Sequence, residues 1–281
     1  MRVLIAFDKF KDALTARDAC RVASATLAKC QPTWEIETAP LADGGDGFCD
    51  MLTGYVDGTF HSAKVTGPTG EAVTARFGIV SKIQLHKFAQ ALLGFQTITQ
   101  KIAIIEMAEC SGIALTPVYG RSPWNTSSAG LGELITAAIQ HGAQGAVIGL
   151  GGSATHDLAL GALERLGVSF IDANGVVVPG SPTPDTWSKI ERIDPSRSTL
   201  PANFEIRLAC DVENPLLGPS GAAAVFGPQK GLFPERFEEI ESLTQKMAKR
   251  LCDACAAEPG TMKIPGTGAA GGAAFGLKVG L

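Results

Sequence analysis

The chain has 281 residues, which is enough for one large domain or for two ordinary ones. Hydrophobic residues make up 45% of it and charged residues 19%, so a packed core is expected and long disordered segments are not. A net charge of −4 argues against nucleic acid or an anionic membrane surface as a partner, although small anionic substrates remain possible.

The N-terminal strand and the cysteines indicate a cytoplasmic protein. Residues 2–7 form an apolar run that leads directly into Asp8, without the pattern of a signal peptide. No apolar run reaches the roughly 18 residues that a membrane span needs. The seven cysteines are scattered, which is typical of reduced thiols, and the lone pair Cys252 and Cys255 is interpreted as structural.

The first part of the chain predicts a βαβα unit. Residues 2–7 and 35–41 have the composition of strands, and Thr15 with Asp18 has capping-box spacing at the start of a helix between them. A second helix is expected from Phe48. Such a unit pairs its strands in parallel, and ligands bind beyond the carboxyl ends of such strands.

The pattern then changes to a hairpin over residues 63–65 and 72–80, which places a domain boundary near residue 58. The segment 82–100 has only weak helical spacing. The further expected strands are 102–106, 146–148, 168–171 and 205–210, and the further expected helices are 131–139, a segment after Asp157, and 237–252. We therefore predict an α/β protein of two α/β domains. Residues 1–58 would form a partial doubly wound parallel domain of Rossmann or flavodoxin type, and residues 59–281 a mixed-sheet domain.

The segment from Ala146 to Asp157 is the most informative one. A buried strand runs into Gly149, Gly151 and Gly152, and a helical pattern follows Asp157. Glycines at such a turn let an anion approach unpaired backbone N–H groups, although a simple strand–helix turn has the same composition. The segment lacks the Gly-Lys-Ser/Thr of a P-loop and the third glycine of the dinucleotide fingerprint.

Four expected strand ends carry charged or polar residues beside glycines. The pairs are Asp8 with Lys11, Asp43 with Asp46, and Asp211 with Asn214, and the fourth end carries Asp157. Carboxylates can bind Mg²⁺ through water, and Lys11 and Lys230 could neutralise a transferring phosphoryl group. The residues alone leave two interpretations open, which are phosphoryl transfer and the glycine-rich turns of an ordinary α/β domain.

Three further residues have two interpretations each. His156 is either a general base or a turn histidine bonded to the backbone, and Glu106 either faces a cleft or caps a neighbouring helix. Arg121 is either a clamp for a substrate carboxylate or a surface charge.

A series of motifs occurs in fixed order and covers nearly the whole chain. The segments are residues 8–11 with 14–16, 42–45, 65–68, 105–108, 111–112, 132–135, 149–155, 209–212 with 214–218, 226–231 and 268–272. This series resembles the bacterial-type glycerate kinase family, which phosphorylates D-glycerate with ATP. The resemblance implies two α/β domains with an active site in the cleft between them, Mg-ATP as the donor and a small hydroxy acid as the acceptor.

Together, the motifs and the resemblance provide a candidate site. The expected catalytic residues are Asp8, Lys11, Asp43, Asp157 and Asp211, and two of these, Asp157 and Asp211, are the expected metal ligands. The expected substrate- or nucleotide-binding residues are Gly44, Gly45, Arg121, Gly151, Gly152, Ser153, Thr155, Asn214, Lys230, Gly268 and Gly271.

The chain departs from the family pattern in three places. The family continues the central loop with Asn-Asp-Gly-Gly, where this chain has His156, Asp157, Leu158 and Ala159. Residues 82–100 resemble an insertion, and similar kinases extend beyond the position of Leu281. A truncated, catalytically impaired remnant that binds glycerate or nucleotide is therefore the alternative to an active glycerate kinase. The missing fingerprint disfavours a nicotinamide-dependent oxidoreductase.

Overall fold

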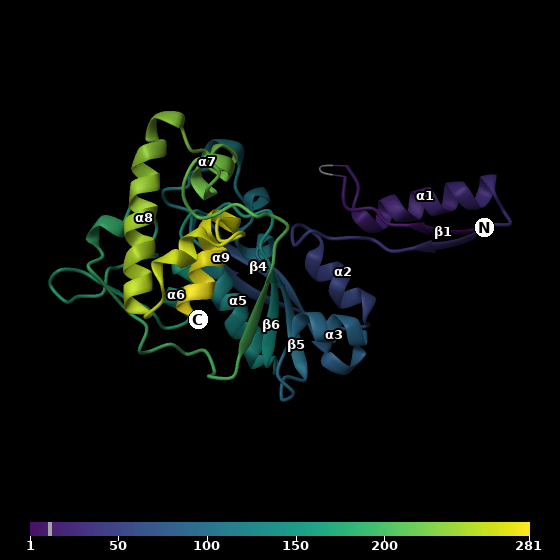
Figure 1. Ribbon diagram of the computed structural model, residues 1–281, viewed down its shortest axis with the longest axis horizontal. Coiled ribbons are helices and arrows are strands. Elements are labelled where there is room, and N and C mark those ends of the chain that lie inside the picture. Colours follow the sequence, from purple (N-terminus) through teal and green to yellow (C-terminus); the bar gives the residue numbers. More distant parts are fainter. Residues whose placement is uncertain (11–12) are drawn as a thin grey trace.

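The computed structural model describes residues 1–10 and 13–281, and its N-terminal part forms a small βαβ unit. Strands β1 (Arg2–Ile5) and β2 (Glu35–Thr38) pair in parallel, and helix α1 (Ala16–Cys30) connects them. As predicted, the Thr15 side chain caps α1 by accepting a hydrogen bond from the Asp18 amide. This unit extends away from the rest of the molecule (Figure 1).

The larger part is built on a five-stranded mixed sheet. Its strands are β3 (Thr59–Thr66), β4 (Ala72–Ser81), β5 (Lys101–Glu106), β6 (Gly145–Gly149) and β9 (Glu205–Ala209), in the order β3-β4-β5-β6-β9. The predicted hairpin β3–β4 is antiparallel, as is the β4–β5 pair, whereas β5, β6 and β9 run parallel. The expected mixed α/β fold class is confirmed, and β1 is not part of this sheet.

Helices cover both faces of the large sheet because its central strands are apolar on both sides. On one face, α5 (Ala129–Gln140) and α9 (Ala269–Gly280) pack with Ile105 and Ile148. On the other face, Phe48 of α2 (Phe48–Tyr55) packs with Ile104 and Val147. Helix α3 (Lys87–Leu93), within the segment with weak helical spacing, flanks the same sheet (Figure 1), and α4 (Ala108–Ser111) contacts β4 and α5.

Helix α2 precedes the predicted domain boundary near residue 58 and yet packs on β4 and β5 of the large sheet. The chain therefore passes from the small unit to the large sheet in the stretch between β2 and α2. The division into residues 1–58 and 59–281 stays a prediction.

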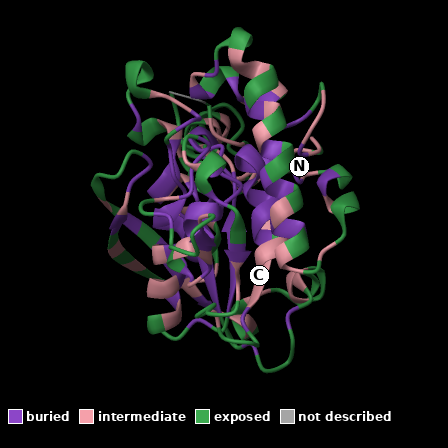
Figure 2. Ribbon diagram, turned by 90° about the vertical axis from the view of Figure 1, so that its left-hand side faces the viewer, coloured by how far each residue is buried: buried purple, intermediate pink, exposed green. Residues whose placement is uncertain are grey.

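A second core lies beside the large sheet. Helices α6 (Leu160–Arg165), α7 (Ala222–Phe226) and α8 (Phe237–Ala254) enclose it with part of α9. The antiparallel pair β7 (Ser169–Ile171) and β8 (Arg192–Asp194) closes one side. Figure 2 shows buried residues through this interior and exposed residues on the outer turns. No helix of residues 1–10 and 13–281 has the length and apolar character needed to cross a bilayer.

Candidate active site

The predicted motifs after the parallel strands of the large sheet lie at one edge. Glu106, Gly149 and Ala209 are paired neighbours at the carboxyl ends of β5, β6 and β9. The central glycine loop, defined here as residues 149–157, and the segment that begins at Asp211 therefore leave the sheet side by side. Ligands bind at this edge in open α/β sheets, so it is where the sequence predicts a ligand site.

The acidic loop, defined here as residues 42–47, follows β2 and meets the central glycine loop backbone to backbone. The Gly151 amide donates a hydrogen bond to the Gly44 carbonyl over 2.9 Å. A Cβ atom added to Gly151 would lie 2.5 Å from the Gly45 Cα, and one added to Gly152 would lie 2.9 Å from an Asp46 carboxylate oxygen. Only glycine permits this approach, so the structure brings together two motifs that are distant in the sequence.

An ion pair holds the acidic loop against the segment that follows β1. Lys9 Nζ lies 3.0 Å from Asp43 Oδ1, which also accepts a hydrogen bond from the Gly45 amide over 2.8 Å. Burial alone would lower the pKa of Lys9, but the bond and charge of Asp43 raise it above its ordinary value. Burial alone would raise the pKa of Asp43, but Lys9 and the Gly45 amide lower it. Asp43 is therefore an ionised carboxylate at neutral pH.

Two expected catalytic residues of the N-terminal unit lie close to this pair in the sequence. The Asp8 carboxylate accepts a hydrogen bond from the Lys9 amide over 2.6 Å and is half-buried. Lys11 lies outside the described residues. Lys9, which sequence reasoning did not select, is the lysine that the structure pairs with Asp43, and its place in the motif of residues 8–11 was the available signal.

The Lys230 side chain contacts the central glycine loop at Ser153 and Thr155. Its Nζ donates hydrogen bonds to Ser153 Oγ at 3.0 Å and to the Thr155 carbonyl at 2.7 Å. The side chain is buried, and burial lowers the pKa of Lys230 to about 7, while the charge of Asp157 acts in the opposite direction. The structure therefore brings together three of the expected binding residues.

Asp157 is fully buried at the end of the same loop. Its Oδ2 accepts hydrogen bonds from the amide and hydroxyl of Ser128, each at 2.7 Å, and from the Gly161 amide at 3.3 Å. This single oxygen therefore lies at the first residues of both α5 and α6, where negative charge is favoured. Burial raises the pKa of Asp157, although the Ser128 bonds oppose the shift. Its Oδ1 is buried without a partner among the described residues.

One residue of the loop and one beside it have clear structural partners. His156 Nε2 lies 3.0 Å from the Thr244 hydroxyl on α8, and burial lowers the pKa of His156 to about 3, so the ring is a poor general base. Glu106 caps α2 by accepting hydrogen bonds from the Gly47 amide at 3.2 Å and the Cys49 amide at 3.1 Å. Burial raises the pKa of Glu106 to about 7, against the effect of these amides.

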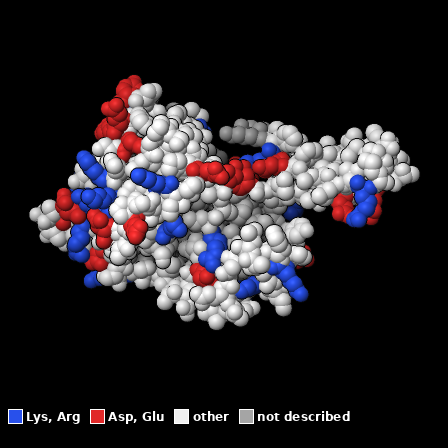
Figure 3. All heavy atoms as spheres, viewed as in Figure 1, with Lys and Arg blue, Asp and Glu red and all other residues white. Residues whose placement is uncertain are grey.

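A second glycine-rich segment, residues 266–272, joins the central glycine loop to the segment after β9. The Gly268 amide donates to the Asn214 carbonyl over 2.9 Å, and a Cβ atom on Gly271 would collide with the Thr155 carbonyl. The Asn214 side chain is bonded to the Ser220 carbonyl at 2.8 Å. Asp211 is exposed at the end of β9. Figure 3 shows acidic side chains gathered between the small unit and the larger part.

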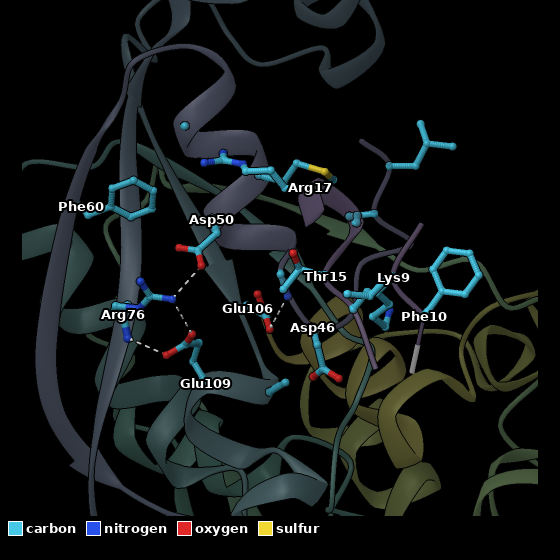
Figure 4. Close-up of a pocket in the computed structure, with 18 of the residues that line it drawn as sticks. Lys9, Phe10, Thr15, Arg17, Asp46, Asp50, Phe60, Arg76, Glu106 and Glu109 are labelled. Atoms are coloured by element: carbon cyan, nitrogen blue, oxygen red, sulfur yellow. Dashed lines mark hydrogen bonds and ion pairs between the residues drawn. The ribbon is translucent and has the colours of Figure 1, made fainter. Parts of the chain in front are cut away.

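A cavity of about 890 Å³ lies between the small unit and the large sheet (Figure 4). Its walls come from α1, α2, β4 and α4, and on one wall Arg76 pairs with Asp50 at 2.9 Å and Glu109 at 3.4 Å. The glycines at residues 149–152 do not line it. The cavity reaches them through Asp46 and Ala108, both of which line it and lie within 3.2 Å of a Cβ position on Gly152.

Arg121 lies apart from this cavity, beside the Lys230–Gly231 turn. A Cβ atom on Gly231 would collide with the Arg121 carbonyl, and the Arg121 Nε is buried without a partner among the described residues. Its expected role as a carboxylate clamp stays a prediction. Ser128 was missed by sequence reasoning, although a serine directly before a helix is a preferred capping residue.

Comparison with known proteins identifies similar chains. A family profile described as "Glycerate kinase family" matches residues 3–281. The chain is 37% identical over 278 residues to a glycerate kinase of Bacillus cereus, an alignment that covers 97% of this chain and 66% of that protein. It is 35% identical over 275 residues to a glycerate 2-kinase of Escherichia coli, again covering 97% and 66%. The chain thus spans 66% of the length of these curated relatives.

A solved structure is similar in fold as well as in sequence. It is the crystal structure of a protein described as a candidate glycerate kinase 2 from Salmonella typhimurium LT2. The TM-score is 0.79 at 33% identity, and the match covers 99% of this chain and 69% of that one.

Proposed function

The chain belongs to the glycerate kinase family, and from this premise we propose that it takes part in the ATP-dependent phosphorylation of D-glycerate. The observation that best supports the proposal is the junction of Gly44 and Gly45 with Gly151 and Gly152 at the carboxyl edge of the strands. Glycine backbones at such an edge can approach a phosphate chain closely. The adjoining cavity of about 890 Å³ falls within the range of ligand sites, about 300–1,000 Å³.

The kinase family implies ATP as a substrate, and we propose that Mg²⁺ enters with it. Among residues 1–10 and 13–281 there is no group of three or more metal-ligating side chains. Single carboxylates fit Mg²⁺, which keeps several waters and is bound largely through substrate phosphates. Asp211 is exposed for such a role, and the unpartnered Oδ1 of Asp157 is the other proposed contact. When bound, the ion would neutralise phosphate charge.

The acceptor is proposed to meet the donor at the acidic loop. Transfer requires the acceptor hydroxyl and the γ-phosphate to be positioned in line, and a carboxylate that orients the hydroxyl contributes to this. Asp43 is ionised and fixed by Lys9, and Asp8 and Asp211 are the other proposed carboxylates. Arg121 is the proposed partner of the glycerate carboxylate, because its planar fork suits bidentate contact. The cytoplasmic location expected from the cysteines stays a prediction.

The proposal is tested by ADP release from Mg-ATP with and without D-glycerate, using the purified 281-residue chain. We expect glycerate-dependent release that falls by about tenfold or more in Gly151→Ala, because overpacking a close contact typically costs about 1–3 kcal/mol. Gly260→Ala is the matched control, since a Cβ atom there meets nothing within 4 Å. Release that does not depend on glycerate, or an unchanged rate in Gly151→Ala, would contradict the proposal.

A further inference from the structure

The Lys230 amine donates hydrogen bonds to one turn of the central glycine loop. An ammonium group carries three donors. In Lys230, one donor bonds Ser153 Oγ at 3.0 Å and another bonds the Thr155 carbonyl at 2.7 Å. These two acceptors lie two residues apart, so the amine bridges the turn that follows Gly152. The side chain is only 2% exposed, which leaves little surface for a ligand to contact.

Lys230 lies on a backbone turn that is itself held by local contacts. Its backbone amide donates to the Gly227 carbonyl over 2.9 Å, and the next residue, Gly231, has a φ of +87°. A Cβ atom at Gly231 would collide with the Arg121 carbonyl, so the backbone at this turn packs directly against residue 121. A rigid base of this kind is suited to holding another segment in place.

Main-chain bonds hold other atoms of the central glycine loop. The Gly151 amide donates to Gly44, the Gly152 carbonyl accepts from Ile113, and the Ala154 amide, between Ser153 and Thr155, donates to Ser111. The Ser153 hydroxyl and the Thr155 carbonyl instead depend on Lys230. Glycine-rich turns lose much conformational entropy on ordering, so an unanchored end would weaken a binding loop.

We propose that Lys230 is a positioning residue, which holds residues 151–155 in the conformation that binds phosphate and does not itself contact the transferring group. The proposal rests on the function proposed above. It assigns Lys230 a different role from the charge neutralisation that the sequence suggests.

The two roles predict different kinetics. A group that stabilises charge only in the transition state lowers kcat when it is removed. Removal of a group that holds a ground-state binding loop mainly raises the KM for ATP and the dissociation constant for Mg-ADP. Lys230→Met keeps the length of the side chain and removes every donor. We expect it to weaken Mg-ADP binding by about tenfold or more, with a smaller change in kcat.

A measurement without ligand separates the roles further. Hydrogen exchange of backbone amides in peptides covering residues 149–157 should be about fivefold or more faster in Lys230→Met than in the unaltered chain. Lys230→Gln retains an amide donor and should give an intermediate result. Lys249→Met, an exposed lysine on α8, is the matched control and should leave exchange unchanged. If Lys230→Met does not fold, Ser153→Ala removes one of the two acceptors and should produce a smaller change in the same direction.

The outcomes distinguish this inference from the proposed function. Unchanged exchange in a folded Lys230→Met, or a fall in kcat with unchanged KM for ATP, would overturn the positioning role. If the unaltered chain does not bind Mg-ADP, the proposed function fails. In that case faster exchange in Lys230→Met would still show that Lys230 holds the turn, and unchanged exchange would refute both.

Discussion

The small N-terminal unit and the large sheet both present acidic residues beyond parallel strands, but they hold them by different means. In the small unit, Asp43 is fixed by an ion pair with Lys9. The pair is partly exposed, since the side chain of Asp43 is 36% exposed and that of Lys9 is 23% exposed. In the larger part, Asp157 is completely buried and bonded to the starts of two helices. Similar sequence motifs can therefore supply either a partly exposed carboxylate in an ion pair or a buried carboxylate that holds the starts of helices together.

Sheet size explains this difference. The small unit has two strands and one helix, and Leu4 on its uncovered face is 63% exposed. In the larger part, five strands with helices on both faces enclose the loop that ends at Asp157 between packed elements. A carboxylate enclosed in this way must find hydrogen bonds inside the protein, because burying an unpaired charge is costly.

The sharpest test of the comparison is Asp157→Ala. This change would leave the Ser128 amide, the Ser128 hydroxyl and the Gly161 amide buried without their acceptor. We expect the free energy of unfolding in urea to fall by about 3 kcal/mol or more, as when one partner of a buried charged network is removed. The exposed Asp211→Ala should change it by at most about 0.5 kcal/mol. Equal effects in the two variants would show that burial does not set the role of these carboxylates.

A second test uses pH at Glu106. Its folded pKa of about 7 is above the ordinary value of 4.5, so the folded state holds the proton more tightly than the unfolded state. The resulting stability is present below about pH 4.5 and is lost as pH rises through about 7. Relative to Glu106→Gln, the unaltered chain should lose roughly 1–3 kcal/mol of unfolding free energy over this window. Urea titrations at several pH values measure this.

The exposed Glu258→Gln is the control for that titration, because its side chain is at the surface. A difference between Glu106→Gln and the unaltered chain that stays constant from about pH 4.5 to about 8 would mean that the capping carboxylate is not perturbed.

A smaller effect is expected at the ion pair of the small unit. Partly exposed pairs contribute up to about 1 kcal/mol, so Asp43→Asn should cost no more than that at pH 7. Because the folded pKa of Asp43 is lowered, its contribution is present above the unfolded pKa and is lost as pH falls through the folded value. A double-mutant cycle with Lys9→Met in low and high salt measures the pair. A coupling well above 1 kcal/mol, or one that salt does not weaken, would contradict the contrast between the two parts.

The smallest effect concerns two alanines in left-handed backbone. Ala159, with a φ of 53°, is fully buried between the central glycine loop and α6. Ala256, with a φ of 52°, is exposed. Left-handed backbone costs a non-glycine residue roughly 1–2 kcal/mol, and a buried methyl group contributes about 0.8 kcal/mol. Ala256→Gly should therefore raise the unfolding free energy by about 0.5–1 kcal/mol, while Ala159→Gly should leave it nearly unchanged. A clear gain in Ala159→Gly would show that packing does not offset the strain there.

Local features of this protein were predictable from its sequence. The cap at Thr15, the hairpin that became β3 and β4, and the strand–glycine–helix order around Gly149 all depend on neighbouring residues. Backbone preferences and periodicity act over a few positions, so a pattern in the chain carries them directly. The ordered motifs also indicate the family to which the chain belongs.

Only the tertiary structure decided which residues meet and which are enclosed. Lys230 bonds Ser153, which is 77 positions away in the sequence. Glu106 caps α2 by accepting from the Cys49 amide, which is 57 positions away. In the sequence, Asp157 and Asp211 have the same appearance as acidic residues after a strand, yet one is buried and the other exposed. Burial depends on how the sheet and helices pack around each strand end, and packing joins segments whose separation along the chain carries no signal of contact.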